Sequence, residues 1–162
     1  FVKMNHTRKV SLALIYLRET IFLQLRDNIS TIDSPNVWGF FGGGIEEGES
    51  SSQALVRELK EETGIDINSQ KVEVNYFFTA QHCSIKTKEL LLEDIFLVNI
   101  EKLSDEYKKE MLNPKEGVQT GIFNIKDIIS SECLFSTRTS DYHDIHQLIK
   151  YAISLFYLKL FP

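Results

Sequence analysis

Six carboxylates (Glu46, Glu47, Glu49, Glu58, Glu61 and Glu62) are concentrated in one short stretch of the chain, which contains only two bases, Arg57 and Lys60. The segment carries a formal charge of −4, whereas the whole protein carries −5 at neutral pH. Carboxylates at this density repel one another unless water or cations compensate them. The segment is therefore a candidate cation-binding site.

The spacing places three of these acids on one side of a helix. At about 100° per residue, Glu58, Glu61 and Glu62 share an arc of about 100°. Leu55 and Leu59 form an apolar stripe beside this arc, which would hold the helix against a core. Arg57 lies one turn before Glu61 and can pair with it.

Oxygen donors without a neighbouring His or Cys suit a hard cation, so Mg²⁺ or Mn²⁺ fits this cluster better than zinc. Gly42, Gly43 and Gly44 precede the helix. Backbone without a Cβ can approach a phosphate or a metal closely. The alternative is that the glutamates form only a solvated helix face.

The complete pattern reads Gly43-x5-Glu49-x7-Arg57-Glu58-Leu59-x-Glu61-Glu62-x-Gly64-Ile65. It resembles the Nudix box of the Nudix hydrolases at all of its defined positions. Phe41 stands where many members have Pro, and Gly44 where many have Lys or Arg. The resemblance implies an α/β fold, an α/β/α sandwich around a mixed β-sheet. It also implies metal-dependent hydrolysis of a nucleoside diphosphate linked to another group.

The resemblance also implies roles for individual residues. Glu58 and Glu62 are expected to be the main metal ligands, with Glu61 as a further ligand or base, Glu49 as an auxiliary ligand or base, Gly43 as a carbonyl ligand and Arg57 as the residue that orients the carboxylates. Glu116, in a later loop before a strand, is the best candidate for a base outside the box. Substrate contacts are expected from Arg26, Trp38, Phe40, Gly42 and Gly44. Core packing is the alternative for Trp38 and Phe40, and a solvated strand end is the alternative for Arg26.

Hydrophobic and turn patterns predict the surrounding elements. Ser50 and Gln53 have the spacing of a capping box, and Gly64 suits a helix C-terminus. The expected strands are 10–17, 21–25, 37–41, 71–79, 90–100 and 118–123, and the glycines are expected to end the third of them. The expected helices are 50–64, a helical turn at 126–130 and a long helix at 141–161. Residues 101–116 are expected to form a loop with a helical turn.

The last helix is apolar almost all round. One stripe, which includes Ile149, Ile153 and Phe156, suits docking on the sheet, and a second face holds Tyr151, Leu155 and Leu158. Such a face is seldom exposed. We expect it to be covered in a homodimer; burial within the domain, or contact with a membrane or another protein, are the alternatives.

Length and composition limit the remaining choices. The chain has 162 residues, which suits a single domain over 1–162. Its acidity argues against stable nucleic-acid binding. No apolar run reaches the roughly 18 residues of a membrane span. Without a visible signal peptide, and with two cysteines outside any CxxC spacing, a cytoplasmic location is expected.

Two classes of function remain open. The first is a pyrophosphohydrolase acting on a small nucleotide, most simply a nucleoside triphosphate or a modified nucleotide of the MutT type. Sequence markers that resemble those of ADP-ribose, diadenosine polyphosphate or coenzyme A hydrolases are absent, although nucleotide sugars and dinucleotides stay as alternative substrates. The second is a nucleotide-binding sensor or scaffold without catalysis. Relatives of that kind typically lack box glutamates, all of which are present here.

Overall fold

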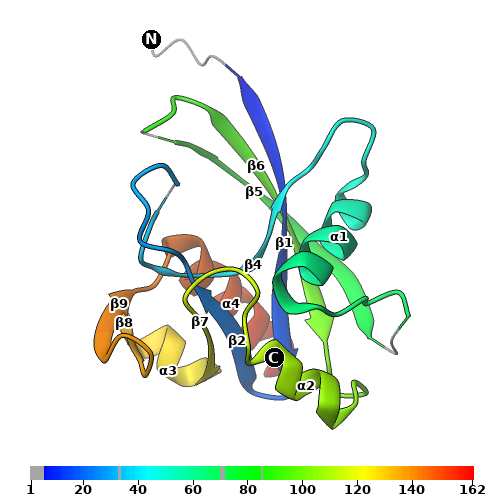
Figure 1. The fold of residues 1–162 in the computed structure, drawn as a ribbon, viewed down its shortest axis with the longest axis vertical. Helices are drawn as coiled ribbons and strands as arrows, with labels where there is room; N and C mark the ends of the chain where they lie inside the picture. Colours follow the sequence, from blue (N-terminus) through cyan, green and yellow to red (C-terminus); the bar gives the residue numbers. More distant parts are fainter. Residues whose placement is uncertain (1–5, 33, 70–71, 85) are drawn as a thin grey trace.

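A mixed β-sheet with helices on both faces forms the centre of the molecule (Figure 1). The computed structural model describes residues 6–32, 34–69, 72–84 and 86–162. In this part of the chain the sheet comprises β1 (Thr7–Leu17), β2 (Thr20–Leu25), β3 (Trp38–Gly39), β4 (Phe41–Gly44), β5 (Glu73–Cys83), β6 (Leu90–Asn99) and β7 (Gln119–Asn124). A separate antiparallel pair consists of β8 (Cys133–Ser136) and β9 (Asp141–Asp144). The helices are α1 (Ser51–Thr63), α2 (Asp105–Met111), α3 (Ile125–Ser130) and α4 (Gln147–Leu160).

Strand β1 organises the sheet because it pairs with three others. It runs parallel to β6 along most of its length. On its other side, its first half pairs with β4 and its last three residues pair with β2, both antiparallel. This division of one strand edge places the glycine strand β4 next to the hairpin partner β2.

Two apolar cores, one on each face of the sheet, give the predicted three-layer sandwich. One core joins the sheet to α1 and α2 through Leu55, Leu59 and Met111. The other joins it to α3 and α4 through residues such as Ile128 and Phe156. The α/β/α prediction is therefore confirmed.

Two predicted elements were wrong at their ends. The long C-terminal helix begins at Gln147, because residues 141–144 pair with β8 as a strand. This pairing is tertiary and leaves little local signal in a polar segment. The glycines do not end the preceding strand: Phe41–Gly44 is itself β4, paired with β1. By contrast, the capping box of Ser50 with Gln53 and the left-handed Gly64 at the end of α1 are confirmed.

Candidate active site

The three glutamates of α1 differ sharply in exposure. Buried Leu55 and Leu59 hold the helix on the sheet, and Ser11 Oγ donates a hydrogen bond to the carbonyl of Ser51. This orientation buries Glu62 to 6% exposure, whereas the side chain of Glu61 remains 52% exposed. The arc therefore has an inner side that faces β4 and an outer side that faces solvent.

The glycines of β4 allow this close approach. A Cβ on Gly43 would lie 2.5 Å from Oε1 of Glu58, so a side chain there would occupy the space of the carboxylate. Gly42 has a φ of +130°, and its N–H donates to Oε2 of Glu62 at 2.8 Å. The box glycines thus bring the strand backbone directly against the two inner carboxylates.

Arg57 links the parts of this acidic segment. Its Nε and Nη2 each donate to one carboxylate oxygen of Glu49 at 2.9 Å. Nη1 donates to Glu58 Oε1 at 2.7 Å, and Nη2 also donates to the carbonyl of Gly44 at 2.9 Å. The expected pairing with Glu61 is present as a longer contact of 3.6 Å. Arg57 therefore fixes Glu49 and Glu58 more firmly than Glu61.

Burial and mutual repulsion raise the pKa values of the inner carboxyls. Burial raises the pKa of Glu62 to about 8, and the charges of Glu58 and Glu116 add to the increase. The hydrogen bond from the N–H of Gly42 lowers this pKa but does not offset the burial. Burial also raises the pKa of Glu58, although Arg57 opposes it. The pKa of Glu49 is lowered because Arg57 donates hydrogen bonds to it. The positive charge near Glu58 and Glu62 is thus too small to balance the two carboxylates.

The donors of this site fit a hard divalent cation. Buried carboxylates, strand backbone without a Cβ and a shortage of positive charge match the oxygen-rich sites of Mg²⁺ and Mn²⁺. Within the described part of the chain, no three His, Cys, Asp or Glu side chains lie close enough together to enclose a metal by themselves. Backbone oxygens, water and substrate phosphates would have to complete the coordination, as is usual for Mg²⁺.

A cavity of about 1270 Å³ adjoins the carboxylates. Gly42, Gly43, Glu58 and Glu62 line it, and so does Glu116, whose charge acts on Glu58 and Glu62. Glu116 is positioned by Gly117, whose φ is +75° and whose missing Cβ makes room for the side chain of Gln24. The structure therefore brings the loop carboxylate to the box carboxylates.

The predicted substrate contacts divide into two groups. Arg26, Phe40 and Gly42 line the cavity, whereas Gly44 meets Arg57 through its carbonyl. The prediction for Trp38 was wrong. Its ring is fully buried, packs edge-on against Phe123 and donates from Nε1 to the carbonyl of Leu134, so it cannot stack on a bound base.

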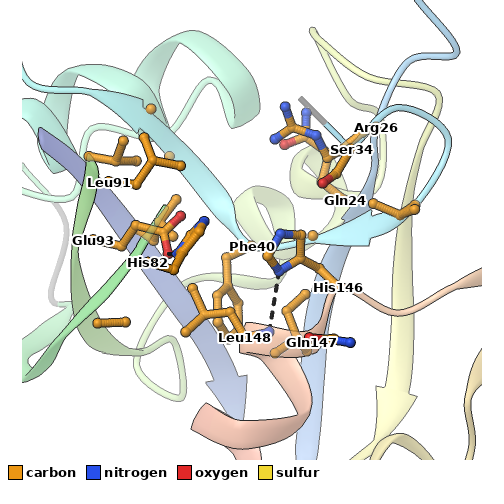
Figure 2. Close-up of a pocket in the computed structure, with 18 of the residues that line it drawn as sticks. Gln24, Arg26, Ser34, Phe40, His82, Leu91, Glu93, His146, Gln147 and Leu148 are labelled. Atoms are coloured by element: carbon orange, nitrogen blue, oxygen red, sulfur yellow. Dashed lines mark hydrogen bonds and ion pairs between the residues drawn. The ribbon is translucent and has the colours of Figure 1, made fainter. Parts of the chain in front are cut away.

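Sequence reasoning predicted Arg26 but missed the other polar residues on the far side of the cavity. Figure 2 shows His82 and Glu93 on one wall, Gln24 and Arg26 on the opposite wall and His146 between them. No spacing in the sequence connects them, because they come from β5, β6, the end of β2 and the residue just after it, and the residues just before α4. Glu93, an acid within the mostly apolar strand Leu90–Asn99, is the one available signal.

Comparisons with known proteins agree with this geometry. The family model of the NUDIX domain matches residues 6–133. Dihydroneopterin triphosphate diphosphatase from Escherichia coli (strain K12) is 38% identical over 71 residues, which cover 41% of this chain and 43% of that protein. RNA pyrophosphohydrolase from Campylobacter jejuni subsp. doylei is 59% identical over 34 residues, 21% of this chain and 22% of that protein. The aligned segments thus span less than half of these curated relatives.

Solved structures show the same fold over nearly the whole chain. A MutT protein from Methanosarcina mazei Go1 superposes with a TM-score of 0.72 at 15% identity, covering 99% of both chains. The E. coli dihydroneopterin triphosphate pyrophosphohydrolase gives 0.65 at 17% identity, covering 96% of this chain and 99% of the other. The matched family model covers well over half of the sequence and includes β1 to α3. The chain belongs to the NUDIX domain family.

Proposed function

We propose that this protein is a metal-dependent pyrophosphohydrolase of small nucleotides, with a nucleoside triphosphate or modified nucleotide as the leading substrate class. The observation that carries the proposal is the pair of half-buried Glu58 and buried Glu62, which faces the glycine strand at the wall of a large cavity. The names of two relatives, an RNA pyrophosphohydrolase and a dihydroneopterin triphosphate diphosphatase, point to the same chemistry.

In this proposal Glu58 and Glu62, with a backbone oxygen of Gly43, hold Mg²⁺ or Mn²⁺, and Glu61 adds a ligand from the solvent side. The bound cation would neutralise the pyrophosphate and lower the pKa of water. Arg57 keeps Glu49 and Glu58 in place through its hydrogen bonds. Glu61 or Glu49 would serve as the base if Glu116 does not.

Glu116 is our preferred general base. Its charge reaches both Glu58 and Glu62, so it lies close to the reacting end of the cavity. It would take a proton from the attacking water as the oxygen bonds to phosphorus. The phosphoanhydride P–O bond then breaks, and the electron pair leaves with the departing phosphate. Arg26, whose charge also reaches Glu62, is placed to contact the phosphate chain.

Product analysis tests this function. The protein is incubated with Mg²⁺ or Mn²⁺ and a panel of nucleoside triphosphates, nucleotide sugars and dinucleotides, and the products are separated by chromatography. We expect cleavage of a phosphoanhydride bond, and expect Glu62→Gln to reduce turnover by at least about 100-fold because it removes a ligand charge. Glu47→Gln, at an exposed box position, is the matched control and keeps activity.

Two outcomes would count against the proposal. Full activity of Glu62→Gln at saturating metal would show that the site is elsewhere. Tight nucleotide binding without cleavage of any tested compound would support the sensor or scaffold alternative instead.

A further inference from the structure

A buried carboxylate faces the cavity away from the box glutamates. The side chain of Glu93, on β6, is only 10% exposed. His82 Nδ1 lies 3.2 Å from its Oε2 but is not aligned to donate a hydrogen bond. Among the described residues, this buried oxygen has no hydrogen-bond partner. A buried carboxylate oxygen that accepts no hydrogen bond is costly, so a bound group with N–H donors would satisfy it.

The surroundings of Glu93 suit a flat ring. Phe40, Leu91 and Leu148 contribute apolar surface to the same cavity. Figure 2 shows Phe40 and Leu148 between the two polar walls and Leu91 on the side of Glu93. His82 and His146 lie close together, with ring centroids 6.4 Å apart. The Nε2 atoms of the two rings can contact further polar atoms of the bound ring, since His82 Nδ1 faces Glu93 and His146 Nδ1 accepts from Leu148. Apolar surfaces with a few polar groups are typical of small-molecule sites.

Arg26 connects this end of the cavity to the metal end. Its charge acts on Glu62 at one end and on Glu93 and His146 at the other. A nucleotide whose phosphates lie at the cation site of Glu58 and Glu62 would therefore extend past Arg26 and place its base near Glu93. This placement rests on the function proposed above.

We propose that Glu93, supported by His82 and His146, recognises the substrate base and selects a ring that presents two adjacent N–H donors, the 2-amino-4-oxo edge. An ionised carboxylate only accepts hydrogen bonds. Adenine and cytosine place a ring acceptor beside their amino group, and uracil and thymine place carbonyls beside their one N–H. Guanine offers a ring N–H beside an amino group, and the pterin ring offers the same edge.

Inosine nucleotides isolate the contribution of the amino group, because hypoxanthine lacks it and is otherwise identical to guanine. We expect kcat/KM for GTP to exceed that for ITP by about tenfold or more, since the analogue leaves the carboxylate partly unpaired. In Glu93→Gln this ratio should fall towards one, mainly through a higher KM for GTP. 7,8-Dihydroneopterin triphosphate, compared with GTP, distinguishes a pterin from a purine substrate.

Asp94→Asn is the matched control. It removes the same charge from the next residue of β6, where the carboxylate accepts a hydrogen bond from Thr79 rather than lining the cavity. Asp94→Asn should keep the GTP/ITP ratio of the wild type. If Glu93→Gln does not fold, His82→Ala, at a side chain 39% exposed, replaces it and should lower the ratio by a few-fold.

Binding of the wild-type protein separates this inference from the proposed function. Titration calorimetry with GMP, IMP and AMP requires no catalysis, and we expect GMP to bind at least about fivefold more tightly than the other two. Equal affinities, a preference for AMP, or a GTP/ITP ratio unaffected by Glu93→Gln would overturn the inference. Hydrolysis without such discrimination would leave the pyrophosphohydrolase proposal standing, whereas selective GMP binding without hydrolysis would do the reverse.

Discussion

Substitution of Glu116 tests whether catalysis depends on a residue outside the box. If this residue accepts the proton of the attacking water, Glu116→Gln should lower kcat by about 10²–10⁴-fold. The metal concentration that gives half-maximal activity should change little, because the box glutamates remain. Steady-state kinetics over a metal titration measure both quantities. An unchanged kcat would return the role of base to Glu49 or Glu61.

Gly43 can be tested against its neighbour on the same strand. In Gly43→Ala the new Cβ would meet the Glu58 carboxylate at 2.5 Å, so the glutamate must move and activity should fall by about tenfold or more. In Gly44→Ala the nearest atoms, of Arg8, are 3.9 Å away, so activity should persist. Turnover and the metal affinity of the two variants check this. If Gly43→Ala were as active as Gly44→Ala, catalysis would not depend on the position of Glu58 against β4.

The box residues could be predicted because helix and strand geometry fix them locally. Glu58, Glu61 and Glu62 lie within two turns of one helix, so their common side follows from the helical repeat. Their different burial could not be predicted, because it depends on how β4 packs against α1. Trp38 shows the same limit, since only the tertiary structure places β7 and β8 around its ring.

His146 links the cavity to the start of helix α4. Its Nδ1 accepts a hydrogen bond from the N–H of Leu148 at 3.3 Å, which makes it the N-cap. Burial lowers the pKa of His146, and the positive charges of His82 and Arg26 lower it further. The neutral ring is therefore the form that the fold favours, because a protonated Nδ1 cannot accept this bond.

This cap predicts an acid-sensitive stability. The folded state releases its proton more readily than the unfolded chain, whose histidine pKa is about 6.5. The contribution of His146 is therefore present above about pH 6.5 and is lost as pH falls below it. His146→Asn keeps an acceptor at every pH. We expect its free energy of unfolding to decline less than that of the wild type between pH 6.5 and 5.

Denaturant unfolding of the metal-free protein at several pH values measures this difference. His146→Ala should cost about 1 kcal/mol at pH 7, as for other lost N-caps. His6→Asn, at an exposed position before β1, is the control and should follow the wild type. Parallel pH profiles for the wild type and His146→Asn would show that this cap does not titrate in the range.

Elements with local signals were predicted well, and those that depend on tertiary pairing were not. The capping box and Gly64 define α1 from adjacent residues alone. Strands β8 and β9 are four residues each and stabilise one another across a turn. Polar Asp141, Tyr142 and Asp144 give such a strand no apolar alternation, so the helix pattern that follows was extended through it.

The arrangement of layers could be predicted from the family resemblance and from the apolar faces of the elements. The cavity could not be predicted in this way. Its walls come from strands far apart in sequence, and the residues that we propose to distinguish substrates lie on different elements. Composition and periodicity describe each element separately. They do not show that Arg26, Glu93 and His146 share one space.

The outer face of α4 is the remaining feature of the whole molecule. Burial within the domain was one alternative for this face, but Tyr151 and Leu158 are 59% and 63% exposed, so that alternative was wrong for these two. Leu160 and Phe161, at the C-terminal end of the helix, are also exposed. No helix in the described part of the chain is long and apolar enough to cross a membrane.

We therefore expect a homodimer in which two copies of this face meet, since a closed two-fold contact covers the same patch on both chains. A stable interface buries about 800 Å² of accessible surface on each partner. The interface must therefore include polar residues around the apolar centre of this patch. Sedimentation at micromolar concentration should give a mass near twice 18.7 kDa. Leu158→Lys should shift it towards the monomer, because the charge would be desolvated at the interface, whereas Asp127→Lys, at an exposed position on α3, should not. A wild-type monomer over this range would rule out the dimer and leave the face exposed or available to a different protein.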